Sequence, residues 1–114
     1  MAQSRVEIFA EMTRQQPDDV MIWYGLASEY TKLERWSEAA DALRRVVSLN
    51  KDYTAAYQML GTALMNLGLK EEARLAWTQG LEVAGRTGAW KARQHMEGLL
   101  AGLGDNAQSE FCKE

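Results

Sequence analysis

The feature that most limits the fold of this chain is a residue pattern that occurs twice, 34 residues apart. The first copy spans 20–53 and the second spans 54–87. Large and small residues recur in the same order in both copies. The matching pairs are Trp23 and Tyr57, Leu26 and Leu60, Ala27 and Gly61, Tyr30 and Leu64, Ala39 and Ala73, and Leu43 and Trp77. A fixed period of this length is typical of a solenoid, in which each unit buries its apolar face against its neighbours.

Within each copy the apolar residues follow the period of an α-helix. Trp23, Leu26, Tyr30 and Leu33 are separated by three, four and three residues, which places them on one face of a helix over 20–33. A second helix is predicted over 38–49, with Ser37 as its N-cap. The second copy predicts helices over 54–67 and 71–84. Each copy is therefore expected to fold as a pair of antiparallel helices.

Glycines mark the expected helix ends in the second copy. Gly68 follows the helix over 54–67 and is predicted to end it in a left-handed conformation. Gly85 and Gly88 are predicted to bound a turn. Gly80 lies inside the helix over 71–84, which predicts a close approach of another helix at that point.

Single helices are predicted on both sides of the two copies. Residues 4–16 form a partial repeat helix that ends before Pro17. Residues 89–103 form a closing helix, whose apolar stripe of Ala89, Ala92, Met96 and Leu99 again steps by three, four and three. Residues 1–103 are thus one domain of about six helices, and residues 104–114 are expected to be a flexible tail.

Composition excludes several classes of function. A net charge of −3 argues against a domain built to bind nucleic acid. No stretch has the roughly 20 apolar residues that span a bilayer, so no membrane association is predicted. Cys112 is the only cysteine, so no internal disulfide can form, and a free thiol in the tail suits a reducing compartment. We therefore expect a cytoplasmic protein.

The paired pattern resembles the tetratricopeptide repeat (TPR). That family combines an aromatic residue, Leu, a small residue and Tyr on the first helix with Ala, an aromatic and a small residue on the second. The first copy here supplies Trp23, Leu26, Ala27, Tyr30, Ala39, Leu43 and Val46, and the second Tyr57, Leu60, Gly61, Leu64, Ala73, Trp77 and Gly80. Phe9, Met12 and Pro17 match the closing half of a preceding repeat, although Arg5 stands where that half expects Ala.

The resemblance covers residues 4–103 and implies a right-handed superhelix of antiparallel α-helix pairs, similar to small stand-alone bacterial TPR proteins. Such proteins line a concave surface with the first helix of each pair. The family therefore implies an adaptor or scaffold that binds a peptide or helix of another protein in this groove. The residues predicted to face the groove are Met21, Tyr24, Ser28, Thr31, Lys32, Gln58, Thr62, Met65, Asn66, Trp90 and Gln94. Tyr24 and Trp90 are the candidate anchors, because aromatic residues dominate binding hot spots. The alternatives are that Tyr24 packs on Phe9 or Met21 and that Trp90 packs inward as the lid of the last repeat.

Two other classes of function stay open. The first helix lacks its partner, so a homo-oligomer that covers Val6, Phe9 and Met12 is the alternative to partner binding. No set of residues in the sequence supports an enzyme, because His95 is the only histidine and no glycine-rich phosphate loop follows a strand. We assign no catalytic residue, no metal site and no cofactor. The gathering of Arg86, Lys91, Arg93 and His95 is read as a solvated face or as a docking patch for an acidic segment.

Overall fold

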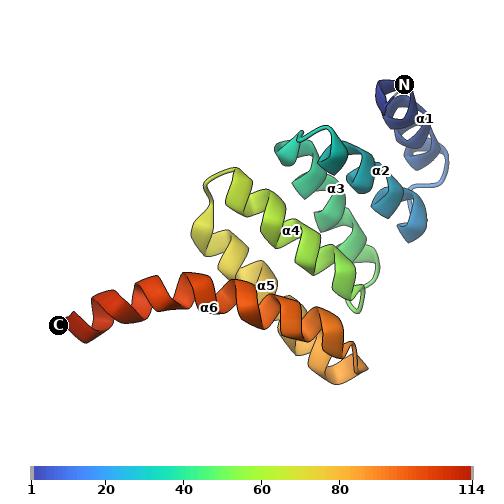
Figure 1. The fold of residues 1–114 in the computed structure, drawn as a ribbon. Helices are drawn as coiled ribbons and strands as arrows, with labels where there is room; N and C mark the ends of the chain where they lie inside the picture. The colour runs from blue at the N-terminus through green and yellow to red at the C-terminus, as the bar shows by residue number, and fades with distance from the viewer. Residues whose placement is uncertain (1, 114) are drawn as a thin grey trace.

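The computed structural model describes the backbone of residues 2–113 and the side chains of residues 5–103, and within 2–113 it contains helices and no strand. The six helices are α1 (Ala2–Gln15), α2 (Val20–Lys32), α3 (Trp36–Leu49), α4 (Thr54–Asn66), α5 (Lys70–Thr87) and α6 (Trp90–Lys113). They follow one another across the molecule in chain order, as Figure 1 shows. The predicted all-α solenoid is confirmed.

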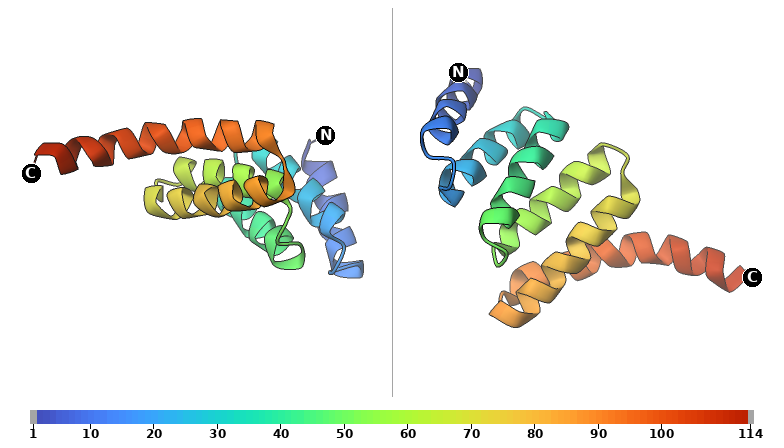
Figure 2. Two further views of the ribbon diagram at one scale, coloured as in Figure 1. Left: turned by 90° about the horizontal axis from the view of Figure 1, so that it is seen from below. Right: turned by 180° about the vertical axis from the view of Figure 1, so that it is seen from behind.

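The helices pair as the repeat predicts. α2 packs on α3 and α4 packs on α5, and these two pairs make the most extensive contacts in the molecule. Each pair also packs on the next, through α3 with α4 and α5 with α6. Alternate helices therefore form two layers, with α2, α4 and α6 in one and α1, α3 and α5 in the other (Figure 2).

Small residues are buried where paired helices approach each other. Ala27, Ala39 and Ala73 have no exposed surface. Gly61 faces the indole ring of Trp77 so closely that no side chain would fit there. A side chain at Gly80 would lie 2.6 Å from Cβ of Tyr57 and 2.7 Å from Sδ of Met96, so the predicted close approach is present. Leu43, Val46 and Met96 fill the space between these contacts and are fully buried.

Three boundary residues have clear structural roles, and two of them, Gly68 and Gly88, were predicted. Asp19 caps α2, and its carboxylate accepts hydrogen bonds from the backbone N–H groups of Met21 (3.0 Å) and Ile22 (3.4 Å). Gly68, with φ 79°, follows the last turn of α4. Gly88, with φ 81°, ends α5. The left-handed conformation at both positions favours glycine because it has no Cβ to clash.

Two boundary predictions are wrong. Ser37 does not cap α3, because the N–H of Ala39 already bonds to the carbonyl of Arg35 at 2.9 Å and the helix therefore begins at Trp36. Gly85 does not open a turn but lies within α5. The apolar face of α5 continues through Val83 and Ala84, both buried, and the helix runs on to Thr87.

The flanking helices also differ in length from the prediction. α1 begins at Ala2 rather than at residue 4, and α6 continues beyond residue 103 to Lys113. The flexibility predicted for residues 104–114 stays a prediction, and the side chain of Cys112 lies outside the described residues. No helix within the described part of the chain is long and apolar enough to cross a membrane.

Two apolar residues of α1, Val6 and Phe9, are already covered inside the chain, whereas Ile8 is 60% exposed. Val6 is 4% exposed, and the ring of Phe9 lies against Gly25 of α2, where a Cβ would come within 2.6 Å of it. Met12 is half-buried. The packing of α1 on α2 therefore covers much of the apolar surface that, in the homo-oligomer hypothesis, a second copy of the chain would cover.

Candidate functional site

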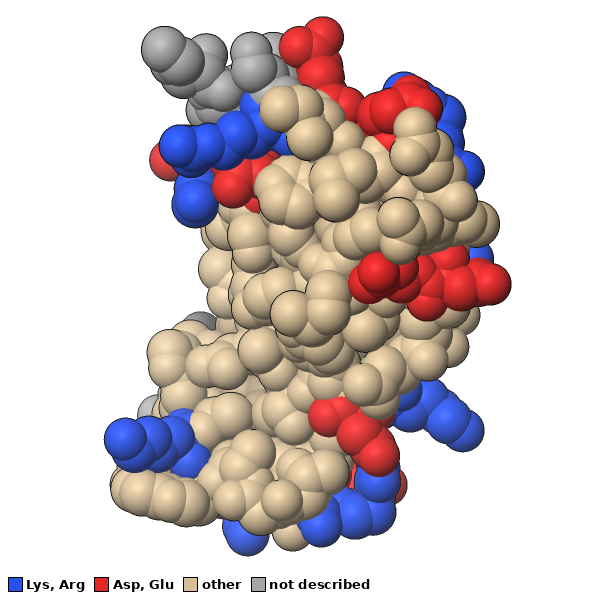
Figure 3. Space-filling model, turned by 90° about the vertical axis from the view of Figure 1, so that its right-hand side faces the viewer, with Lys and Arg blue, Asp and Glu red and all other residues tan. Residues whose placement is uncertain are grey.

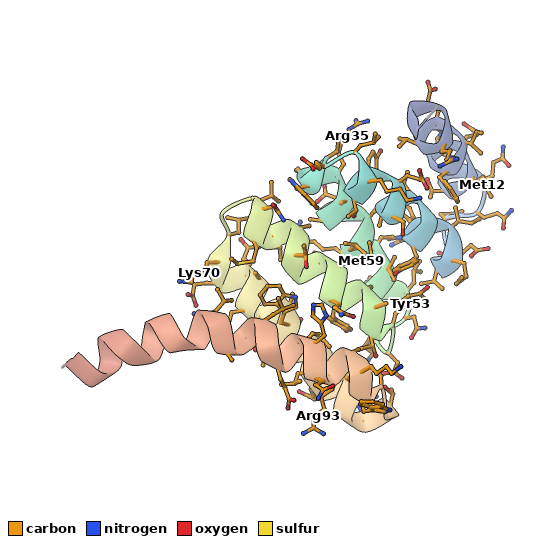
Figure 4. All side chains as sticks on the ribbon, viewed as in Figure 1. Met12, Arg35, Tyr53, Met59, Lys70 and Arg93 are labelled. Atoms are coloured by element: carbon orange, nitrogen blue, oxygen red, sulfur yellow. The ribbon has the colours of Figure 1, made fainter. Side chains whose placement is uncertain are left out.

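A hollow of about 200 Å³ lies where the three helices of one layer meet. α2 contributes Thr31, α4 contributes Gln58, Met59 and Thr62, and α6 contributes His95. Figure 4 shows Met59 along the middle of α4. This hollow joins all three helices that the sequence assigns to the concave side, and we call the surface around it the groove. It brings together three predicted residues, Thr31, Gln58 and Thr62.

The hydroxyl groups of the groove are held by their own helices. Thr31 Oγ1 donates to the carbonyl of Ala27 at 2.8 Å, and Thr62 Oγ1 donates to the carbonyl of Gln58 at 3.2 Å. Asn66 Nδ2 donates to the carbonyl of Thr62 at 2.9 Å. Because each threonine hydroxyl uses its proton within its own helix, Thr31 and Thr62 present oxygen lone pairs toward the groove, while the Asn66 amide keeps one further N–H.

A sulfur–aromatic cluster lies at the end of the groove where α2 and α4 begin. The rings of Tyr24 and Tyr53 are 4.9 Å apart and tilted by 35°. Tyr53 Oη lies 3.6 Å from Sδ of Met21, which is 63% exposed. Burial, and then the nearby Tyr53, raise the pKa of the Tyr24 phenol. Tyr24 is thus partly covered by Tyr53, a contact that the sequence did not predict; Figure 4 shows Tyr53 at the turn before α4.

The other predicted groove residues are spread around the hollow. Met65, Asn66 and Gln94 are exposed and Ser28 is half-buried. Lys32 Nζ lies 3.3 Å from Oε2 of Glu29 on the same helix.

Trp90 is not part of the core and not part of the hollow around Thr31. It is 64% exposed at the start of α6 and lines a separate hollow of about 290 Å³. Lys91 Nζ lies 5.8 Å from the centre of its ring. Trp90 is therefore accessible, but at a distance along the surface from the residues that α2 and α4 contribute.

Sequence reasoning missed three residues of this surface, Tyr53, Met59 and His95. Met59 and His95 each follow a predicted residue directly, at Gln58 and Gln94. A slightly wider helical face would have included both. Tyr53 precedes α4, and the direction of a turn residue cannot be read from helical periodicity.

Larger hollows exist on the opposite side of the repeats. One of about 370 Å³ includes Leu26, Tyr30 and Ala42, and one of about 220 Å³ includes Leu60 and Leu64 with Ala76. The second set is the first set shifted by 34 residues. A hollow that recurs with the period of the sequence follows from how the repeated helices pack, so its volume alone does not make it a site.

Two of the basic residues near the start of α6 have carboxylate partners. Arg86 Nη1 lies 2.7 Å from Oδ1 of Asp52, and Arg93 Nε lies 3.4 Å from Oε2 of Glu97. Among the described residues, no group of three His, Cys, Asp or Glu side chains is placed to hold a metal ion. The groove around His95 offers packing surface and hydrogen-bond acceptors, which suits binding.

Comparison with known proteins agrees with this architecture. The family model "Tetratricopeptide repeat" matches residues 22–53 and 54–85, more than half of the chain. The chain belongs to the tetratricopeptide repeat family. The predicted family is thereby confirmed, and TPR domains are protein–protein interaction modules that are typically not enzymes.

Similar proteins are found in bacteria. The "TPR repeat-containing protein PA0015" of Pseudomonas aeruginosa is 31% identical over 98 residues, which cover 86% of this chain and 93% of that protein. The solution structure of protein BPP2914 from Bordetella parapertussis has a TM-score of 0.77 and 25% identity, covering 93% of this chain and 92% of that one. A crystal structure of MamA has a TM-score of 0.70 at 20% identity. The match covers 78% of this chain and 49% of the MamA chain, and it shows the fold alone.

Proposed function

We propose that this TPR protein is an adaptor that binds a peptide or helix of another protein in the groove formed by α2, α4 and α6. The observation that carries the proposal is the hollow that Thr31, Thr62 and His95 line from three different helices. A segment lying across these helices would contact all three at once. The recurring use of helical surfaces as grooves for peptides supports this mode.

The size of the hollow favours a protein partner. Pockets for whole small molecules usually have about 300–1,000 Å³, and this one has about 200 Å³. It suits one inserted side chain of a longer segment. The neighbouring Tyr24 and Tyr53 offer aromatic contact area beside it, and aromatic residues are enriched at binding hot spots.

Site-specific cross-linking tests the proposal. A photoreactive amino acid is placed at Thr62 in the groove or, as a matched control, at Thr78 of α5 in the other layer. Both threonines are exposed and donate to the carbonyl four residues earlier, so the two replacements disturb the helix alike. We expect partner proteins to be cross-linked from Thr62 and not from Thr78. Cross-links only from Thr78, or equally from both, would contradict a groove ligand.

We also propose a cytoplasmic location, supported by the single cysteine of the chain, which allows no internal disulfide. Neither nucleic acid nor a membrane is proposed as a ligand. Fractionation of cells that produce the protein at its natural level checks the location.

A further inference from the structure

The central helix of the groove carries no charge. α4 has no Asp, Glu, Lys or Arg between Thr54 and Asn66, although a quarter of the whole chain is charged. A segment of 13 residues with the average composition would carry about three such residues. On the side of the molecule drawn in Figure 3, which is turned by 90° from the view of Figure 1, a broad area without Lys, Arg, Asp or Glu is bordered by charged side chains.

The hollow itself has the same character. Thr31 from α2 and Gln58, Met59 and Thr62 from α4 are uncharged, and His95 from α6 is the only titratable side chain among the lining residues. The nearest lysine in sequence, Lys32, is already paired with Glu29. A charged side chain that entered this hollow would lose water and find no carboxylate, lysine or arginine among the lining residues, which is unfavourable.

We propose that the partner segment is uncharged where it crosses α4 and inserts an aliphatic or amide side chain beside Met59 and Thr62. Methionine adapts its shape to apolar side chains, and the threonine oxygen accepts hydrogen bonds from an amide. This inference rests on the proposed groove function, because it specifies the chemistry of the segment that the groove takes.

Selection from a library of random linear peptides displayed on phage tests the inference. The protein is used in its full length, as wild type, as Thr62→Lys and as Thr78→Lys, the same change on the other layer. We expect peptides enriched on the wild type to be depleted severalfold, relative to the library, in Asp, Glu, Lys and Arg at their central positions. Thr62→Lys should instead enrich peptides with a central Asp or Glu, and Thr78→Lys should select as the wild type does.

The outcomes distinguish the uncharged-segment inference from the groove function on which it rests. One outcome is that peptides enriched on the wild-type protein carry charged residues at their central positions as often as the library does, and that Thr62→Lys reduces their enrichment. This outcome would overturn the uncharged-segment inference and leave groove binding intact. No enrichment on the wild type, or enrichment that Thr62→Lys leaves unchanged, would overturn the groove function itself.

A second, independent observation concerns the two ends of the array. In the internal repeats Ala39 and Ala73 have no exposed surface, and the position 34 residues before Ala39 is Arg5. Aligning the stripe of α6 with that of α4 likewise places Arg93 at the position of Ala27 and Gly61. Both terminal helices thus carry an arginine where the internal repeats have a buried small residue.

Each arginine occupies the surface that a further helix would need. At Gly61 the adjoining helix leaves no room for any side chain. At the corresponding place on α6 the side chain of Arg93 is 55% exposed and paired with Glu97, and Figure 4 shows it on the side of α6 away from α4. At the other end Arg5 is 63% exposed, with Nη1 3.9 Å from Oε1 of the buried Glu29.

We infer that Arg5 and Arg93 prevent a second copy of the chain from stacking onto either end. Within residues 2–113, α1 and α6 each lack the second helix of a repeat pair, and end-to-end stacking of such units would generate an open filament. A bulky charged side chain at the contact point excludes the close helix approach that stacking requires. The array therefore stays monomeric, with a polar outer surface at its ends.

Light scattering over a concentration series compares the wild type with the double variant Arg5→Ala/Arg93→Ala. Alanine favours a helix, so both variant positions keep their helical backbone, and circular dichroism verifies this. We expect the wild type to stay monomeric and the double variant to gain mass with concentration. Arg44→Ala/Arg86→Ala, which removes the same charge from exposed positions within the array, should stay monomeric. A wild type that associates, or a double variant that does not, would overturn the inference.

Discussion

The indole ring of Trp77 packs directly onto the backbone of Gly61, and its Nε1 donates a hydrogen bond to the carbonyl of Gln58 at 3.1 Å. This contact fixes how closely α4 and α5 approach. It also ties the core to the groove, because Gln58 lies in the lining of the hollow. The position of α4, which forms one wall of the groove, thus depends on the contact between Gly61 and Trp77 on the side of α4 that faces α5.

Gly61→Ala should destabilise the protein by about 1–3 kcal/mol, because the added methyl group overpacks the contact with Trp77. Gly98→Ala provides the matched control, since Gly98 has open space around it within α6. That change should stabilise the protein by about 0.5–1 kcal/mol through helix propensity. Urea unfolding measures both free energies. Equal effects at the two glycines would show that the Gly61–Trp77 contact does not limit packing.

Trp77 and Trp90 should differ sharply when replaced by alanine. Trp77 is 3% exposed, so Trp77→Ala leaves a large cavity and should cost about 3–5 kcal/mol of unfolding free energy. Trp90 is 64% exposed, so Trp90→Ala should change the unfolding free energy by no more than about 0.5 kcal/mol. Chemical denaturation followed by circular dichroism compares the two. A large loss for Trp90→Ala would mean that Trp90 is packed in solution.

Asp19→Ala should cost about 1 kcal/mol, because the first turn of α2 loses the carboxylate that accepts from the N–H groups of Met21 and Ile22. Asp18→Ala removes the same charge next to it. The Asp18 side chain is 88% exposed and its pair with Arg45 is 3.6 Å long, so its loss should matter little. Thermal unfolding of both variants decides the matter, and similar losses would contradict a specific cap.

Titration of the Tyr57 phenol should make the unfolding free energy depend on pH in the alkaline range. Burial, and then the nearby Asp52, raise the pKa of this phenol above its ordinary value of 10.0. The folded state therefore holds the proton more tightly than the unfolded state, so this contribution is complete below pH 10 and is lost as the pH rises through the folded-state pKa.

Tyr57→Phe removes this titration and should flatten the fall in unfolding free energy above pH 10. At neutral pH the unfolding free energy of the variant should be about 1 kcal/mol lower than that of the wild type, because the variant loses the hydrogen bond from Tyr57 Oη to the carbonyl of Lys51. Urea unfolding at several alkaline pH values tests both effects. Identical alkaline slopes for the two proteins would contradict the role of Tyr57.

Much of the groove could be predicted, but not its boundaries. Thr31, Gln58 and Thr62 follow from helical phase, since the apolar stripe defines the buried face and thereby its opposite. Met59 and His95 lie at the margin of that face, and only the packing of α4 beside α6 turns them toward the hollow. The exposure of Trp90 depends on the residue at which α6 begins. The apolar stripe of α6 alone does not determine that residue.

The sequence by itself determined the repeat, the helix pairing, the small-residue contacts and the family, because side-chain size at a fixed period dictates which faces can be buried. The tertiary structure decided the ends of α3, α5 and α6, since hydrogen bonds and packing of the last turns override local capping signals, as at Ser37 and Gly85. It also decided which residues of different helices meet in the groove. Such contacts join positions far apart in the chain, and a one-dimensional period carries no information about them.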